Sequence, residues 1–99
     1  MNEAFELKEK GNSQFSKGDY QGALLHYKSA IGIASLDSNK ENIAEANKLL
    51  STLYLNSAIC SINTDKLNEG DELLNKALGI DSSYIKALYW KAKLLFKKG

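Results

Sequence analysis

The stretch GALLHYKSAIGIA, residues 22–34, decides how the chain folds. Its apolar side chains recur at the spacing of one face of an α-helix: Ala23, Leu24, Tyr27, Ala30, Ile31 and Ala34. The preceding stretch AFELKEKGNSQF, residues 4–15, follows a similar pattern. Between the two, Gly18 can adopt the left-handed conformation that ends a helix, and Asp19 can cap the next one. Proline is absent from the sequence. We therefore predict an all-α chain.

The sequence also repeats itself at two shifts. At a shift of 47 residues Gly11 aligns with Ala58, and Tyr27 aligns with Leu74. At a shift of 34 residues the aligned pairs are Tyr54 with Leu88, Ala58 with Ala92 and Ile62 with Phe96. A unit of two helices with a period of about 34 residues is typical of tetratricopeptide repeats (TPRs). The larger shift equals one such unit with an insertion of 13 residues.

These shifts predict a TPR superhelix of two repeats followed by the first helix of a third. We expect repeat 1 at about 4–37, an insertion at about 35–47, repeat 2 at about 51–84 and a terminal helix at 85–98. The helices are expected at roughly 3–17, 20–34, 41–64, 67–79 and 83–98. The inserted residues are compatible with helix, so we expect them to lengthen the helices on either side of the first inter-repeat turn.

Small residues, Gly11 and Ala58 among them, are expected to let paired helices approach closely, with larger side chains filling the remaining gaps. We assign the second role to Phe15, Tyr20, Tyr27 and Phe96, and we count Leu88 and Ala92 as packing residues too. The last helix has apolar residues on more than one face. The chain is therefore expected to be a piece of a longer protein, or to bury that helix against another chain.

Composition argues against several functions. The net charge is +1, arginine is absent, and acidic and basic residues interleave, which does not favour nucleic-acid binding. No apolar run approaches the roughly 18 residues that a membrane-spanning helix needs, and the N-terminus does not resemble a secretory signal. The only cysteine, Cys60, indicates a reducing compartment, so we expect a cytoplasmic location. Cys60 and the only histidine, His26, are interpreted as packing or surface residues, which predicts neither catalysis, nor a metal site, nor a cofactor.

A family resemblance adds to this reading. The stretch LKEKGNSQFSKGDYQGALLHYKSAI, residues 7–31, resembles the first TPR of co-chaperones that bind the C-terminal tails of heat-shock proteins 70 and 90. The stretches LYLNSAIC and NKALGIDSSYIKALYWKAKLLF resemble the second repeat and the start of the third. The insertion looks most like the TPR region of large immunophilins, the FKBP-type prolyl isomerases. Myosin-chaperone and stress-inducible co-chaperone TPRs are similar as well.

This resemblance implies a set of binding residues known as the carboxylate clamp. Basic and amide side chains of this clamp hold the terminal carboxylate and last aspartate of a peptide. The clamp positions of the family match Lys8, Asn12, Asn56 and Lys86, whereas the family's fifth residue, an arginine, falls on Trp90. Lys8 and Asn12 share a helix face because they lie four residues apart. Phe15, Trp90 and Lys93 are further expected groove residues, and Lys93 stands near enough to Trp90 in sequence to supply part of the missing charge.

The expected ligand is a chaperone peptide ending in Glu-Glu-Val-Asp. A second hypothesis keeps the TPR fold but gives the groove to another helix or an extended segment, without recognition of a free carboxylate. Trp90 and the apolar last helix favour that hypothesis, which also predicts self-association through the last helix.

Overall fold

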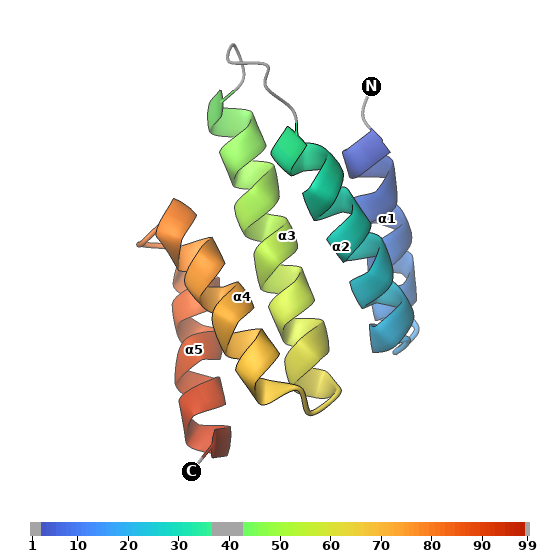
Figure 1. Ribbon diagram of the computed structural model, residues 1–99. Coiled ribbons are helices and arrows are strands. Elements are labelled where there is room, and N and C mark those ends of the chain that lie inside the picture. The colour runs from blue at the N-terminus through green and yellow to red at the C-terminus, as the bar shows by residue number, and fades with distance from the viewer. Residues whose placement is uncertain (1–2, 37–42, 99) are drawn as a thin grey trace.

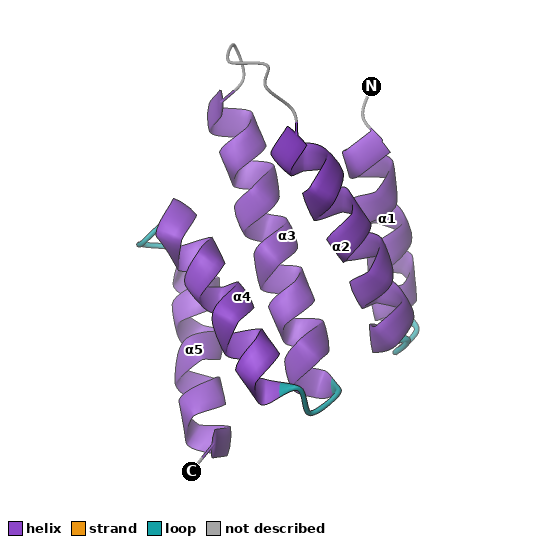
Figure 2. Ribbon diagram, in the orientation of Figure 1, coloured by secondary structure: helices purple, strands orange, loops and turns teal. Residues whose placement is uncertain are grey.

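The computed structural model describes residues 3–36 and 43–98, and these residues form five helices and no strand (Figures 1 and 2). The helices are α1 (Glu3–Ser16), α2 (Tyr20–Leu36), α3 (Ile43–Asn63), α4 (Leu67–Ile80) and α5 (Ile85–Lys98). The predicted all-α fold is confirmed, and each described boundary lies within two residues of its expected place. The helices next to the insertion, α2 and α3, are 17 and 21 residues long, against 14 for each of the others. Residues 37–42 of the predicted insertion lie outside the described residues.

Successive helices pack against one another as antiparallel neighbours (Figure 1). Helices α1 and α2 form one hairpin, α3 and α4 form a second, and α5 lies against α4 and α3. The molecule measures 43 × 29 × 17 Å. Helix α3 is the central element because it contributes Leu53 and Cys60 to the core of the first hairpin and Leu55 and Ile62 to the core of the second. The two hairpins are therefore joined into one body through α3.

The two hairpin turns are built alike. In the first, the Gly18 N–H donates to the Phe15 carbonyl (3.0 Å) and the Asp19 N–H donates to the Gln14 carbonyl (2.9 Å). This pair of bonds defines a Schellman motif, in which the residue before the last adopts a positive φ. Gly18 has φ +82° as expected, and Asp65, which is 47 residues further on, has φ +67° in a turn with the same two bonds. Aspartate tolerates this conformation better than most residues.

Close approach inside each hairpin depends on small residues, as the repeat predicted. A Cβ added to Gly11 of α1 would lie 2.6 Å from Cε1 of Tyr27 in α2, and one added to Gly70 of α4 would lie 2.8 Å from Cγ1 of Ile62 in α3. Tyr27 is fully buried, and the rings of Phe15 and Tyr20 meet edge to face at 5.3 Å. The ring of Tyr27 thus packs directly against Gly11, where no side chain would fit between them.

The packing prediction was wrong for α5. Phe96, Leu88 and Ala92 are exposed, whereas Ala87 and Leu94 are fully buried. The reason is geometric, because the face that aligns with the paired face of α3 has no helix against it among the described residues.

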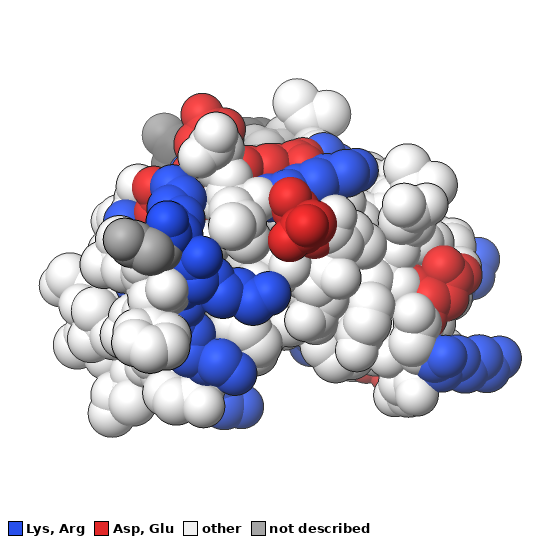
Figure 3. All heavy atoms as spheres, turned by 90° about the horizontal axis from the view of Figure 1, so that it is seen from below, with Lys and Arg blue, Asp and Glu red and all other residues white. Residues whose placement is uncertain are grey.

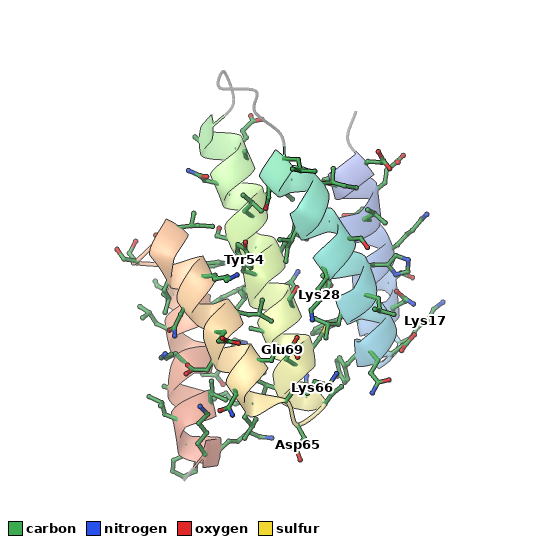
Figure 4. The ribbon with its side chains drawn as sticks, in the orientation of Figure 1. Lys17, Lys28, Tyr54, Asp65, Lys66 and Glu69 are labelled. Carbon is green, nitrogen blue, oxygen red and sulfur yellow. The ribbon has the colours of Figure 1, made fainter. Side chains whose placement is uncertain are left out.

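Ion pairs link helices on the surface. Lys28 of α2 and Glu69 of α4 point toward each other across α3 (Figure 4), with 2.5 Å between Nζ and Oε1. Lys91 of α5 donates to Asp71 of α4 at 2.7 Å, and Lys98 approaches the same carboxylate at 3.7 Å. Lys91 therefore forms an ion pair that joins α5 to α4 at the edge of the second core.

Candidate peptide-binding groove

A hollow of about 250 Å³ opens between the first three helices. Asn12, Phe15 and Ser16 line it from α1, Tyr27 lines it from α2, and Asn56 lines it from α3. The structure thus brings together the two amide residues of the predicted clamp, and it places Phe15 beside them. Both asparagines are half-buried, so their amides are accessible to a ligand that enters the hollow.

Tyr27 fixes the orientation of the first of these amides. Its phenol donates a hydrogen bond to Oδ1 of Asn12, with 2.5 Å between the oxygens. Since the carbonyl end of the amide accepts this bond, the NH₂ end is left to donate elsewhere. Burial raises the pKa of Tyr27 to about 12, although a hydrogen bond with the Asn56 side chain acts in the opposite direction. The phenol therefore remains a protonated donor at neutral pH.

The sequence reasoning assigned Tyr27 to the core and did not identify it as a site residue. A signal for the second role was present, because a buried tyrosine needs a hydrogen-bond partner that a phenylalanine would not need.

The predicted lysines lie outside the lining of the hollow. Lys8 is one turn before Asn12 on α1, and its Nζ lies 5.3 Å from the centre of the Phe5 ring. Lys86 is exposed near the start of α5. Neither lysine is joined to a carboxylate by a described ion pair within 4.0 Å. Both are long flexible cations, and their assignment to the clamp stays a prediction.

Several known proteins are similar in sequence to most of this chain. No protein-family profile matches the sequence. The chain is 34% identical to protein unc-45 homolog B of Homo sapiens over 93 residues, which are 94% of this chain and 9% of that protein. It is 32% identical to peptidyl-prolyl cis-trans isomerase FKBP4 of Mus musculus over 85 residues, which are 84% of this chain and 19% of that protein. The chain is a TPR domain.

The match to an FKBP-type isomerase confirms the expected likeness to that group of TPRs. A similar match, 34% over 89 residues, is found with zinc finger CCCH domain-containing protein 7B of Homo sapiens, covering 90% of this chain and 9% of that protein. The chain spans less than a fifth of the length of these three relatives. TPR domains are protein-interaction modules rather than catalytic ones.

Helix α5 adds a cationic stripe to the TPR domain. Lys86, Trp90, Lys93 and Lys97 are spaced four, three and four residues apart, so they share one face of the helix. Trp90 is half-buried against the second core, and Nζ of Lys93 lies 4.6 Å from the centre of its ring. Figure 3 shows lysine side chains gathered over the half of the molecule that contains α4 and α5. The charge of Lys93 is thus held beside Trp90, at the position where the family has its arginine.

The only cysteine and the only histidine of the sequence, Cys60 and His26, are both engaged inside the TPR domain. Burial raises the pKa of the Cys60 thiol to about 12, and Nδ1 of His26 contacts Oε1 of Gln14. Residues 3–36 and 43–98 hold no group of three or more His, Cys, Asp or Glu side chains that could bind a metal ion. Among these same residues, no helix is both long enough and apolar enough to cross a membrane.

Proposed function

We propose that this TPR domain is a peptide-binding adaptor for the C-terminal tail of heat-shock protein 90 or 70, with Glu-Glu-Val-Asp as the expected ending. The observation that carries the proposal is that Asn12 and Asn56 line the same hollow. There the Tyr27 hydroxyl donates a hydrogen bond to Oδ1 of Asn12, so the NH₂ group of that amide stays available to a ligand. A terminal carboxylate has only acceptors, and it would enter a site that offers amide donors.

Lys8 and Lys86 complete the proposed site. Lys8 shares a helix face with Asn12, and Lys86 lies on the stripe of α5 that also holds Trp90. Charge-assisted hydrogen bonds to a carboxylate are roughly twice as strong as neutral ones. The two lysines therefore supply most of the attraction, and the two asparagines supply direction.

The identified relatives support this assignment. The resemblance of residues 7–31 to co-chaperone TPRs agrees with the matches to unc-45 homolog B and FKBP4. The isomerase activity in the name of FKBP4 is not assigned to this chain, which covers 19% of that protein. We further propose a cytoplasmic location, which a co-chaperone role and the single cysteine both favour.

The test is a calorimetric titration with an acetylated pentapeptide ending in Glu-Glu-Val-Asp. The same peptide with a C-terminal amide serves as the ligand control. We expect the free acid to bind and the amide to bind much more weakly, because the amide lacks the terminal charge. Equal binding of the two peptides, or binding of neither, would rule out the clamp.

Matched protein variants locate the binding. Lys8→Ala and Asn56→Ala should each weaken binding of the free acid by about 1–3 kcal/mol. Lys10→Ala removes an exposed lysine from the same helix and should leave binding unchanged.

A second candidate function is binding of an internal segment, and the indole of Trp90 in place of an arginine favours it. Recognition of an internal segment does not use a terminal carboxylate. Under this second function, the free-acid and C-terminal-amide peptides should therefore bind equally well. Self-association through α5 stays a separate prediction, and sedimentation at two protein concentrations tests it.

A further inference from the structure

Ser16 is the last residue of α1, and it lines the hollow together with Asn12 and Asn56. The residue is exposed, and its hydroxyl makes no hydrogen bond to another side chain or carbonyl within residues 3–36 and 43–98. Peptide binding as proposed above gives Ser16 no role, although it borders the space assigned to the terminal carboxylate. A chemical change at this hydroxyl would therefore act directly on the binding site.

The sequence after Ser16 has a pattern that protein kinases use. The stretch SKGD, residues 16–19, carries an acidic side chain three positions after the serine. Acidophilic serine kinases select their substrates by a carboxylate at this spacing. Among the residues that the structure describes, no other serine or threonine has this spacing, and elsewhere in the sequence Ser38 has it with Glu41. The pattern thus singles out the serine that borders the hollow.

The local structure leaves this stretch open to an enzyme. Residues 16–19 are all exposed, and α1 ends there at the left-handed turn of Gly18. Asp19 accepts a hydrogen bond from the Gly22 N–H at 3.0 Å, which holds its carboxylate at the surface. Helix ends open more readily than helix interiors. A kinase therefore needs to open only the last turn of α1 to reach the Ser16 hydroxyl.

We propose that Ser16 is phosphorylated by a kinase that reads Asp19, and that the phosphate closes the hollow to a peptide carboxylate. This inference rests on the proposed function, because it concerns the regulation of the same hollow. The reaction transfers the γ-phosphoryl group of Mg·ATP. A bond forms between Oγ of Ser16 and the γ-phosphorus, and the bond from that phosphorus to the bridging oxygen of ADP breaks. ADP leaves with the electron pair, and the hydroxyl proton passes to a base of the kinase.

The phosphate and the peptide would compete for the same donors. Phosphoserine carries about 1.5–2 negative charges at neutral pH and has three acceptor oxygens. The NH₂ group of Asn12, which Tyr27 leaves available, and the amide of Asn56 can donate to a phosphate as they can to a carboxylate. The hollow has a volume of about 250 Å³, so a second anion there would meet the first at close range. Like charges in close contact repel strongly, so binding of one anion excludes the other.

The first experiment tests modification of the hydroxyl. The protein would be incubated with casein kinase II and Mg·ATP, and tandem mass spectrometry would map the phosphate. Asp19→Asn is the matched variant, because asparagine caps a helix as well as aspartate does but has no charge. We expect phosphate on Ser16 of the wild type and much slower modification of Asp19→Asn. Absence of phosphate from Ser16, or equal rates in the two proteins, would overturn the proposal.

The second experiment measures the effect on binding. Protein with phosphoserine inserted at position 16 during translation would be titrated with the free-acid peptide by calorimetry. Ser16→Gln controls for side-chain size, and Ser29→Glu places a negative charge on an exposed residue of α2 outside the hollow. We expect affinity to fall by about tenfold or more with phosphate on Ser16 and to change little in both controls. Unchanged affinity of the phosphorylated protein would overturn the proposal, as would an equal loss in either control.

A third readout needs no peptide, and it separates this inference from the proposed function. Phosphorus NMR follows the titration of the phosphate on Ser16, whose pKa falls when amides donate to the dianion. Asn56→Ala should raise that pKa, whereas Asn68→Ala, on an exposed residue of α4, should leave it unchanged. If the unmodified protein binds no peptide but Asn56→Ala gives this shift, the proposed ligand is wrong and the phosphate site is supported. If the peptide binds and Asn56→Ala leaves the phosphate titration unchanged, the proposed function stands and this inference is overturned.

Discussion

The phenol of Tyr27 and the carbonyl oxygen of Asn12 lie 2.5 Å apart, and this hydrogen bond joins the core of the first hairpin to its candidate binding groove. The ring of Tyr27 rests against Gly11, so its position is set by packing. Its hydroxyl then sets the orientation of the Asn12 amide. Packing within the hairpin thus determines which end of the amide faces a ligand.

Tyr27→Phe tests this relationship. The ring and its packing remain, but Asn12 loses the donor that orients it, so peptide affinity should fall by a factor of about five, equivalent to about 1 kcal/mol. Stability to urea should fall by no more than about 1 kcal/mol, because the freed Asn12 oxygen can reach water. Calorimetry and urea unfolding measure the two effects. Unchanged affinity with reduced stability would mean that the bond serves the core alone.

Trp90→Arg tests the departure from the family pattern. Restoring a guanidinium beside Lys86 should raise affinity for the free-acid peptide by about tenfold, since a charge-assisted contact is worth about 1.5–3 kcal/mol before costs. Stability should fall because Trp90 packs on the second core. Trp90→Gln is the neutral control and should lower stability without improving affinity. If the two variants bind the peptide equally, the position contributes no charge to the site.

Gly11→Ala tests close packing in the first hairpin. The added methyl group would lie 2.6 and 2.8 Å from two atoms of the Tyr27 ring, so the free energy of unfolding should fall by about 1–3 kcal/mol. The control is Gly79→Ala in α4, where an added Cβ meets no atom within 4 Å. That change should stabilise the protein by about 0.5–1 kcal/mol through helix propensity. Urea unfolding curves of the two variants should therefore move in opposite directions.

Asp71→Asn tests the ion pairs that join α5 to α4. The hydrogen bond from Lys91 is the main reason why the pKa of Asp71 lies below its ordinary value. A carboxylate with a lowered folded-state pKa stabilises the fold above its unfolded pKa of about 3.9, and this contribution is lost as the pH falls through the folded value. Asp71→Asn should therefore be less stable than the wild type at neutral pH, by no more than about 1 kcal/mol, with a difference that shrinks in acid. A difference independent of pH would indicate lost packing instead of lost charge.

Cys60 offers a measure of opening at α3. Its side chain is fully buried and burial raises its pKa to about 12, so the reactive thiolate is scarce in the folded protein. A thiol-reactive reagent in mildly alkaline buffer should modify Cys60 slowly in the native state and rapidly in concentrated guanidinium chloride. Mass spectrometry at intervals follows the modification. Rapid labelling of the native protein would show that α3 opens readily.

Much of the fold follows from local pattern. The helical period over residues 22–34 and the 47- and 34-residue shifts were enough to place the helices, because each helix must turn an apolar face toward its neighbour. The family resemblance predicted Asn12 and Asn56 as binding residues. Their binding role stays a prediction, and the structure shows that both line one hollow. Tyr27 as a site residue was not, because its role depends on a contact between positions 15 residues apart on different helices.

The sequence by itself determined the all-α architecture, the small residues at helix contacts and the glycine that ends α1. Tertiary structure decided which partners those residues meet. It gave Asp65 the same left-handed conformation as Gly18 and paired Lys91 with Asp71. Within residues 3–36 and 43–98, it sets no helix against Leu88, Ala92 and Phe96, unlike their counterparts in α3. The physical reason is that periodicity along a chain fixes which face of a helix is apolar, whereas only the arrangement of the helices in space fixes whether that face is covered.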